Sequence, residues 1–198
     1  MSDIGLILLA AGGSSRMGQP KQLLRWHGVS LLRRAANTAL ASGCAPIIVV
    51  TGAFADRAAD ELSDLPSALI EPNLQWQLGM GASIRAGLHR ALRERPKPDA
   101  ILMMLCDQPH VEASHLRQLC DTYRATNKPV IASEYAQTIG APCLFAASCF
   151  GDLLGIADSE GAKRLIQGSM ERVVIPLPAG SIDVDTPRDY DKLCKGSR

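Results

Sequence analysis

The chain has 198 residues, of which 46% are hydrophobic and 21% are charged, and this composition suits one globular domain with a sizeable core. A formal net charge of only +1 argues against a protein that coats nucleic acid, because such a protein needs a basic stripe. The apolar run Ile4–Ala11 is too short to cross a bilayer, which takes about 20 residues, and none of the six cysteines belongs to a Cys-x-x-Cys pair. We therefore expect a cytoplasmic protein with reduced thiols and with neither a membrane nor a nucleic acid as partner.

Short apolar runs alternate with helical patterns along most of the chain. The runs are continuous rather than alternating, which is typical of buried parallel strands; they are Ile4–Leu9, Pro46–Thr51, Ala68–Glu71, Ala100–Leu105 and Pro129–Ala132. Apolar stripes predict helices over Ser30–Ser42, Gly81–Arg95 and Glu112–Ala125. Ser30 is a suitable N-cap and Gly43 a suitable end for the first of these helices. The alternation predicts an α/β fold with a mainly parallel central sheet.

The pattern loosens after about residue 134. Glu134–Phe145 is predicted as a short hairpin-like excursion, Asp158–Gln167 as a helix, Val173–Ile175 as a strand and Pro187–Leu193 as a closing helix. In open α/β sheets, ligands bind at the carboxyl ends of the strands. Glycine, proline and polar residues gather where the predicted strands end: in the glycine-rich run after Leu9, in Thr51-Gly52, in Glu71-Pro72-Asn73 and in Cys106-Asp107-Gln108-Pro109. We therefore expect the functional site at that edge. The histidines form no metal-like cluster, and we expect all four at the surface: His27, His89, His110 and His115.

The segment from Leu9 to Lys21 is a glycine-rich loop after the first predicted strand. Small residues let backbone N–H groups approach a phosphate closely, while Arg16 offers a fork of donors and Lys21 a point charge. The loop is not a Walker A motif, since Gln19-Pro20 stand where Lys and Ser/Thr are required, and this disfavours a P-loop ATPase. Phosphate binding and an ordinary strand-to-helix turn with spare glycines both remain open from the residues alone.

Two acidic segments offer metal ligands. Asp107 directly follows a buried strand, where a charge needs a partner such as a metal ion, a helix N-terminus or a surface ion pair. In the segment from Ile182 to Asp185, an extended chain would place Asp183 and Asp185 on one face. Thr186 is a good N-cap for the closing helix, with Asp189 completing a box-like cap, so we leave both out of the chemistry.

Three further segments are candidates for substrate contact. Asn73 to Ser83 contains glycines and Trp76 just before a predicted helix, which suits either a base-binding loop or a helix entry that covers the core. Gly140 to Phe145 has the form G-x-P-x-x-F. At Lys163, a predicted helix start could meet a phosphate, although a solvated lysine on a helix explains it equally.

These segments together resemble the MobA-like nucleotidyltransferases, which include molybdenum cofactor cytidylyltransferases and guanylyltransferases. The resemblance rests on L-A-A-G-x-S-x-R-M-G-x-x-K, L-x-D-Q-P and D-x-D-T-P, and covers roughly Ile4 to Tyr190. It implies a Rossmann-like three-layer nucleotidyltransferase fold in a single domain, 1–198. The nucleotide-binding half would span about 1–110 and the acceptor-binding half about 111–198. Ala11 and the run N-x-x-W-x-x-G-M-x-x-S are similar to the cytidylyl branch and favour CTP over GTP.

The resemblance also implies roles for individual residues. Arg16, Lys21 and Asp107 would be catalytic. The nucleotide would be bound by Ala10, Ala11, Gly12, Gly13, Arg16, Lys21, Asn73, Gly79, Met80 and Ser83. Asp107 and Asp185 would hold Mg²⁺ or Mn²⁺, with Asp183 as the second candidate beside Asp185. Pro142 and Lys163 would lie near the acceptor; Asp158-Ser159-Glu160 departs from the family's usual Gly-Asp-x before that lysine.

The implied reaction is transfer of CMP from CTP to the terminal phosphate of molybdopterin or molybdenum cofactor, with release of pyrophosphate. A phosphate monoester has a second pKa of about 6, so it attacks as a dianion without a general base. The implied partners are these substrates and, transiently, a xanthine-oxidase-type molybdoenzyme or its chaperone. Two alternatives stay open: a nucleotidyltransferase that uses GTP or a sugar-phosphate acceptor, and a non-catalytic cofactor-binding protein.

Overall fold

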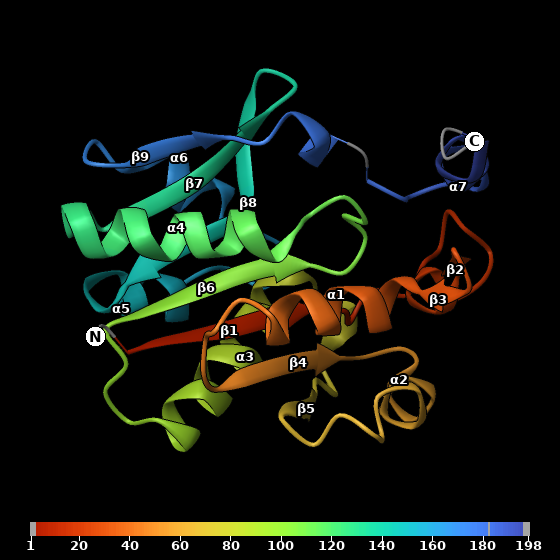
Figure 1. Cartoon of the computed structure of the whole chain (residues 1–198). Helices are drawn as coiled ribbons and strands as arrows, with labels where there is room; N and C mark the ends of the chain where they lie inside the picture. Colours follow the sequence, from red (N-terminus) through yellow and green to blue (C-terminus); the bar gives the residue numbers. More distant parts are fainter. Residues whose placement is uncertain (1–2, 182, 196–198) are drawn as a thin grey trace.

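The computed structural model describes residues 3–181 and 183–195. Its centre is a seven-stranded sheet in the order β5-β4-β1-β6-β8-β7-β9 (Figure 1). The strands are β1 Ile4–Leu9, β4 Ile47–Thr51, β5 Ala68–Pro72, β6 Ala100–Leu105, β7 Val130–Tyr135, β8 Thr138–Ala146 and β9 Val173–Pro176. The first four run parallel, β8 runs antiparallel to both neighbours, and β9 runs parallel to β7. The predicted mainly parallel sheet is confirmed.

Helices cover both faces of this sheet. They are α1 Leu31–Leu40, α2 Ala55–Glu61, α3 Met80–Glu94, α4 Ala113–Thr126, α5 Phe150–Leu154, α6 Lys163–Gly168 and α7 Pro187–Lys195. One buried cluster joins α1, α2 and α4 to the sheet, and a second joins α3, α5 and α6 to the opposite face. Leu6 and Leu8 of β1 lie in the first cluster and Ile7 in the second. Because each strand is buried on both sides, its apolar run is continuous, and the three-layer α/β prediction is confirmed.

The predicted helix caps are present. Ser30 Oγ accepts a hydrogen bond from the backbone N–H of Arg33 at 3.0 Å, so it caps α1. At α7, the Thr186 N–H donates to Asp189 Oδ2 at 3.0 Å, and the Asp189 N–H donates back to Thr186 Oγ1 at 3.3 Å. This reciprocal capping box accounts for both polar residues without any part in the chemistry.

The predicted helix over Asp158–Gln167 is wrong in its first half, because α6 begins only at Lys163. The backbone before it is held as a loop by the start of α3. The Gly81 N–H donates to the Asp158 carbonyl oxygen at 2.9 Å, and a Cβ on Gly79 would lie 2.5 Å from that oxygen. Arg85 also pairs with Asp158. Tertiary contacts therefore override the local helical pattern.

Several elements escaped the sequence prediction. A two-stranded hairpin, β2 Arg25–Trp26 with β3 Val29–Ser30, precedes α1, and α2 and α5 are short helices with weak periodicity. The hairpin-like excursion is real but larger than expected, since β8 reaches Ala146 and pairs with β6. His115 is a correction: it is only 7% exposed and hydrogen-bonds Ser133 Oγ at 2.7 Å, so it is a core histidine rather than a surface one.

The β2–β3 hairpin and α7 lie together beyond the carboxyl ends of β1, β4 and β6 (Figure 1). A small separate cluster packs them, in which Trp26 and Leu31 meet Val184 and Leu193. This packing brings the late acidic segment back to the edge where the glycine-rich loop emerges. Among the helices of the described ranges, none combines the length and apolar character needed to cross a membrane.

Candidate active site

Four segments meet at the carboxyl edge of the sheet around a cavity of about 290 Å³. They are the loop after β1, the end of β6, the entry to α3 and, beside them, the chain before α7. Most of the residues predicted to bind the nucleotide line this cavity: Ala10, Ala11, Gly12, Gly13, Lys21, Gly79, Met80 and Ser83. Asp107, predicted as a metal ligand, lines it too. We call it the loop cavity. The structure thus brings together side chains that are up to about a hundred residues apart in the sequence.

Gln22, which the sequence analysis missed, holds the glycine-rich loop in shape. Its side chain is buried, and Nε2 donates to the carbonyl oxygens of Ala10 at 3.1 Å and Gly12 at 2.6 Å. Its Oε1 accepts from Ser14 Oγ at 3.1 Å. With these carbonyls turned toward Gln22, none of the described hydrogen bonds uses the N–H groups of Gly12 or Gly13. Such free N–H groups form the kind of concavity that binds an anion.

Trp76 explains why two of the glycines cannot carry a side chain. A Cβ on Gly13 would lie 2.8 Å from the Trp76 ring, and a Cβ on Gly52 would lie 2.4 Å from the Ala11 carbonyl oxygen and 2.7 Å from Trp76. Trp76 sits in a short 3₁₀ turn, Trp76–Leu78, and its ring forms part of the cavity wall. The tryptophan therefore both covers the loop and fixes its distance from the α3 entry.

Asn73 supports the cavity from behind rather than lining it. Its side chain is buried, with Nδ2 donating to Ser83 Oγ at 3.0 Å and Oδ1 accepting from the Gln75 N–H at 2.9 Å. Ser83 reaches the cavity wall in the first turn of α3. Asn73 is thus placed to orient Ser83 and the turn that carries Trp76.

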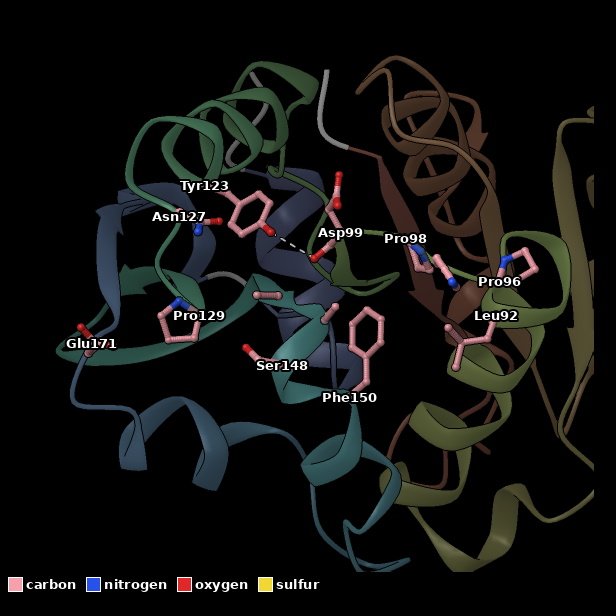
Figure 2. Close-up of a pocket in the computed structure, with 13 residues that line it drawn as sticks. Leu92, Pro96, Pro98, Asp99, Tyr123, Asn127, Pro129, Ser148, Phe150 and Glu171 are labelled. Atoms are coloured by element: carbon pink, nitrogen blue, oxygen red, sulfur yellow. Dashed lines mark hydrogen bonds between the residues drawn. The ribbon is translucent and has the colours of Figure 1, made fainter.

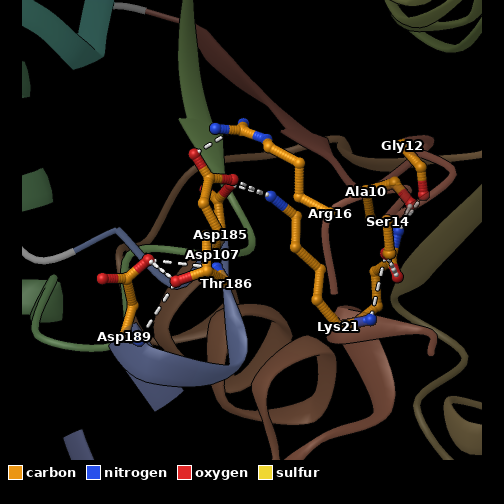
Figure 3. A network of polar contacts seen from close by, with 10 residues as sticks. Ala10, Gly12, Ser14, Arg16, Lys21, Asp107, Asp185, Thr186 and Asp189 are labelled. Carbon is orange, nitrogen blue, oxygen red and sulfur yellow. Dashed lines mark hydrogen bonds and ion pairs between the residues drawn. The ribbon is translucent and has the colours of Figure 1, made fainter. Parts of the chain in front are cut away.

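Lys21 joins the two acidic segments. Its Nζ lies 2.5 Å from Asp107 Oδ2 and 2.8 Å from Asp185 Oδ1, and Arg16 Nη2 lies 2.9 Å from Asp185 Oδ2 (Figure 3). The Lys21 and Asp107 side chains are largely enclosed, at 15% and 16% exposure, whereas the Arg16 side chain is 68% exposed. The Val184 N–H also donates to the Asp107 carbonyl oxygen at 3.0 Å. This last contact ties the late segment directly to the end of β6.

The charges of this cluster shift the pKa values of its members. Burial alone would lower the pKa of Lys21, but the carboxylate of Asp107 and hydrogen bonds to Asp107 and Asp185 raise it above its usual range. Desolvation would raise the pKa of Asp185, yet Lys21 and Arg16 outweigh it and lower that pKa. Burial, with Asp107 beside it, raises the pKa of the Cys106 thiol to about 12, so this thiol stays neutral at the site.

Asp107 and Asp185 fit a divalent cation. Asp107 Oδ1 is buried and, among the described residues, has no hydrogen-bond partner. An unpaired buried oxygen of this kind costs about 1–3 kcal/mol, and carboxylate oxygens are the ligands that Mg²⁺ prefers. Within the described part of the chain, no three metal-ligating side chains converge. The protein therefore supplies at most a pair of carboxylates here, which is usual for Mg²⁺ bound together with substrate phosphates.

A second cavity of about 260 Å³ adjoins the loop cavity and shares Leu9, Met80 and Leu105 with it. We call it the adjoining cavity. Lys163 and Asp183 line it, together with Tyr135. Desolvation and the neighbouring carboxylates of Asp107 and Asp185 raise the pKa of Asp183 to about 6.

Pro142, by contrast, is not in the wall of the adjoining cavity. It is a buried residue, and its carbonyl oxygen accepts from Ser133 Oγ at 2.6 Å. The neighbouring Ala141 does reach the wall. The structure thus places the G-x-P-x-x-F segment at this cavity, but with the proline behind its surface.

A larger cavity, of about 790 Å³, lies away from these residues (Figure 2). It is lined by Pro96, Pro98 and Asp99, which precede β6, and by Phe150 and Tyr123, whose hydroxyl donates to the Asp99 carbonyl oxygen at 3.1 Å. It therefore sits at the amino end of β6, opposite the edge where α/β sheets bind their ligands. None of the candidate residues from the sequence lines it.

Comparison with known proteins identifies the family of the chain. The family model described as a MobA-like NTP transferase domain matches residues 6–173. The chain belongs to this family. The match begins in β1, spans the glycine-rich loop and Asp107, and ends in β9. It therefore includes the whole lining of the loop cavity and that of the adjoining cavity except Asp183.

Individual relatives cover nearly the whole chain. Purine catabolism protein PucB of Bacillus subtilis (strain 168) is 29% identical, over 94% of both chains. Molybdenum cofactor cytidylyltransferase of Escherichia coli (strain K12) is 26% identical over 96% of this chain and 95% of its own length. The crystal structure of Rv0371c from Mycobacterium tuberculosis H37Rv, a complex with manganese, superimposes with a TM-score of 0.81 at 26% identity, covering 98% of this chain and 99% of that one.

Proposed function

We propose that the chain transfers CMP from CTP to the terminal phosphate of molybdopterin or molybdenum cofactor and releases pyrophosphate. Membership of the MobA-like NTP transferase family supplies the reaction class. The observation that carries the proposal is the contact of Lys21 with both Asp107 and Asp185, beside a loop with free N–H groups. Phosphoryl-transfer sites need this combination of cation, carboxylates and backbone donors, because their chemistry is mainly positioning and charge compensation.

The loop cavity is the proposed nucleotide site. The N–H groups of Gly12 and Gly13 face the triphosphate, and Arg16 and Lys21 balance its charge. Asp107 and Asp185 would hold Mg²⁺ or Mn²⁺, whose bound charge would stabilise the departing pyrophosphate. The manganese complex of Rv0371c supports a divalent cation in this fold.

The reaction forms a bond between an acceptor phosphate oxygen and the α-phosphorus of CTP and breaks the bond from that phosphorus to the pyrophosphate oxygen. The acceptor phosphate has a second pKa of about 6 and is mostly dianionic at pH 7, so no protein base needs to take a proton from it. The site is consistent with a reaction that needs no general base, because Lys21 and Arg16 pair with carboxylates there and the Cys106 thiol is neutral. The main barrier is repulsion between two polyanions, which these cations reduce.

The base is proposed to contact Met80 and the turn around Trp76, which form part of the wall of the loop cavity. Cytosine is preferred to guanine because Ala11 and the Trp76–Met80 run resemble the cytidylyl branch.

The adjoining cavity is the proposed acceptor site. It is lined largely by residues after about position 110, including Lys163, whose ammonium is proposed to meet the acceptor phosphate. The loop cavity is lined only by residues before that point. This division supports the proposed nucleotide-binding half of about 1–110 and acceptor-binding half of about 111–198. A xanthine-oxidase-type molybdoenzyme or its chaperone is the proposed transient recipient of the product.

The test is pyrophosphate release with Mg²⁺ and molybdenum cofactor, with CTP, GTP, ATP and UTP compared in parallel. The proposal expects release with CTP far above that with GTP. A preference for GTP would keep the site and overturn the base. Release only with a sugar phosphate as acceptor would overturn the acceptor. Tight cofactor binding without release from any nucleotide would point instead to a binding protein.

A further inference from the structure

Asp183 lies on the acceptor side of the site rather than with the metal pair. It lines the adjoining cavity and is absent from the wall of the loop cavity, where Asp107 is found. Lys21 contacts Asp107 and Asp185, but no ion pair joins Lys21 to Asp183 among the described residues. The three aspartates do not converge into a metal-binding group in the described part of the chain. One carboxylate is therefore left over beside the acceptor cavity.

The local chain explains how Asp183 and Asp185 serve different cavities. Val184 between them is fully buried, and its N–H is bonded to the Asp107 carbonyl oxygen at 3.0 Å. This anchor fixes the chain at the end of β6, with Asp185 at Lys21 and Arg16 and Asp183 at the adjoining cavity. The path of the chain thus brings the two carboxylates to different cavities, while Asp183 stays close enough to Asp107 and Asp185 to feel their charges.

Gln108 braces the wall that Asp183 faces. It is only 4% exposed, and its Nε2 lies 3.3 Å from Tyr135 Oη, 3.3 Å from the Ala141 carbonyl oxygen and 3.4 Å from the Gly180 carbonyl oxygen. Tyr135 and Ala141 both line the adjoining cavity. A single buried amide thus connects three segments of this wall. It also hydrogen-bonds the carboxylate of Asp183, a residue that is itself exposed.

The rest of the adjoining cavity suits a flat ring. Met80, Met103, Ile139 and Ile166 supply apolar surface, and methionine sulfur contacts aromatic faces favourably. Lys163 is the cation of the cavity wall and suits a phosphate. An ionised carboxylate accepts hydrogen bonds only, and its two oxygens match two adjacent N–H donors.

We infer that Asp183 recognises the acceptor ring through two adjacent N–H groups, as on the 2-amino-4-oxopyrimidine edge of a pterin. This inference rests on the proposed function, which supplies a pterin as acceptor. Asp183 is then a specificity-determining residue: a ring with an oxygen at position 2 places an acceptor against an acceptor and is rejected. A site built to hydrogen-bond a donor discriminates strongly against an analogue that lacks it, because the buried partner is left unpaired.

The experiment compares two fluorescent ligands, 6-hydroxymethylpterin phosphate and its lumazine counterpart, in which an oxygen replaces the 2-amino group. Binding is measured with Mg²⁺ and a non-hydrolysable CTP analogue present. The wild type is expected to bind the pterin at least about tenfold more tightly than the lumazine. Asp183→Asn presents one donor and one acceptor, which match the lumazine edge, so the preference is expected to disappear or reverse. Asp152→Asn, an exposed aspartate on α5 outside both cavities, is the matched control and keeps the wild-type preference.

A second readout separates recognition from metal binding. Mn²⁺ binding with the CTP analogue, followed by electron paramagnetic resonance, is expected to persist in Asp183→Asn and to weaken in Asp185→Asn. An unchanged ligand preference in Asp183→Asn, or loss of Mn²⁺ equal to that in Asp185→Asn, overturns the inference while leaving the proposed function intact. If the wild type binds neither ring but transfers a nucleotide to another acceptor, both the inference and the proposed acceptor fail.

Discussion

The ammonium of Lys21 lies 2.5 Å from the carboxylate of Asp107, although 86 residues separate them in the sequence. They emerge from adjacent strands, β1 and β6, at the same edge of the sheet. Lys21 occupies the space between Asp107 and Asp185, the two carboxylates proposed to hold the metal ion. A divalent cation on this pair of carboxylates would therefore compete with the lysine until a nucleotide offers the lysine its phosphates.

Lys21→Met is expected to change turnover and metal binding in opposite directions. Turnover falls at least about 100-fold, the scale of losing one preorganised charge contact. Free Mn²⁺ binds at least about tenfold more tightly without nucleotide, because the competing ammonium is gone. Lys97→Met, at an exposed position, is the control. Calorimetric titration with Mn²⁺ decides the matter, and weaker binding in Lys21→Met would show that the lysine organises the carboxylates rather than competing for them.

Arg16→Ala is expected to separate activity from stability. The side chain is 68% exposed, so its ion pair with Asp185 contributes less than about 1 kcal/mol to folding. Its proposed contact with the triphosphate is worth at least about 100-fold in turnover. Urea unfolding should therefore change little while pyrophosphate release collapses. Near-normal turnover would remove Arg16 from the mechanism.

Gly12 and Gly13 form a matched pair for testing the loop. A Cβ at Gly13 would meet the Trp76 ring at 2.8 Å, whereas a Cβ at Gly12 meets nothing within 4 Å. Gly13→Ala is expected to lose about 1–3 kcal/mol in the free energy of unfolding, the usual cost of overpacking. Gly12→Ala should stay within about 0.5 kcal/mol of the wild type. Equal losses in the two variants, measured by urea unfolding, would refute the role given to Trp76.

The carboxyl of Asp185 is expected to make the folding stability depend on pH in the acid range. Lys21 and Arg16 hold its pKa below the ordinary value of 3.8, so the folded state binds fewer protons than the unfolded state near that pH. The stabilisation is complete above about pH 4 and is lost as the pH falls through the lowered pKa. The stability advantage of the wild type over Asp185→Asn should therefore shrink below about pH 4. An advantage that is constant from pH 3 to pH 7 would contradict the lowered pKa.

The carboxyl of Asp183 is expected to change the folding stability with pH in the opposite direction. Its pKa is raised from 3.8 to about 6, so between these values the folded state binds more protons than the unfolded state. Stability from this group is present at low pH and is lost as the pH rises through that window. Asp183→Asn should remove this decline, and the variant should gain on the wild type between pH 4 and pH 7. Parallel stability curves for the two proteins would mean that the carboxyl is not perturbed in the fold.

Much of the fold was predictable because both faces of the sheet are covered, which leaves continuous apolar strands such as Ile4–Leu9 that stand out in the sequence. The first half of the helix predicted over Asp158–Gln167 failed for a tertiary reason. Gly79 and Gly81 allow α3 to approach the loop backbone closely, and nothing in the loop's own sequence records this contact. The short hairpin at Arg25–Ser30 has too few residues for a reliable periodicity.

The candidate site, like the fold, was predictable in part. A carboxylate after a buried strand pointed to Asp107 and the glycine-rich loop pointed to Lys21, and the structure joins the two. Gln22 and Gln108 were missed because their roles depend on burial, which a single polar residue does not reveal. A glutamine followed by Leu23-Leu24 is a weak hint of burial for the first. The position of Asp183 in the wall of the adjoining cavity could not be predicted, because it depends on how buried Val184 anchors the chain in three dimensions.

The most direct test of the central claim follows the α-phosphate of CTP. CTP labelled at that phosphate is incubated with Mg²⁺, molybdenum cofactor and either the wild type or Asp107→Asn, with labelled GTP in parallel, and the products are separated. The account predicts that the wild type moves the label from CTP onto the cofactor as a dinucleotide, with little transfer from GTP and at least about 100-fold less in Asp107→Asn. Label that stays on CTP in the wild type, or transfer that survives unchanged in Asp107→Asn, would contradict it.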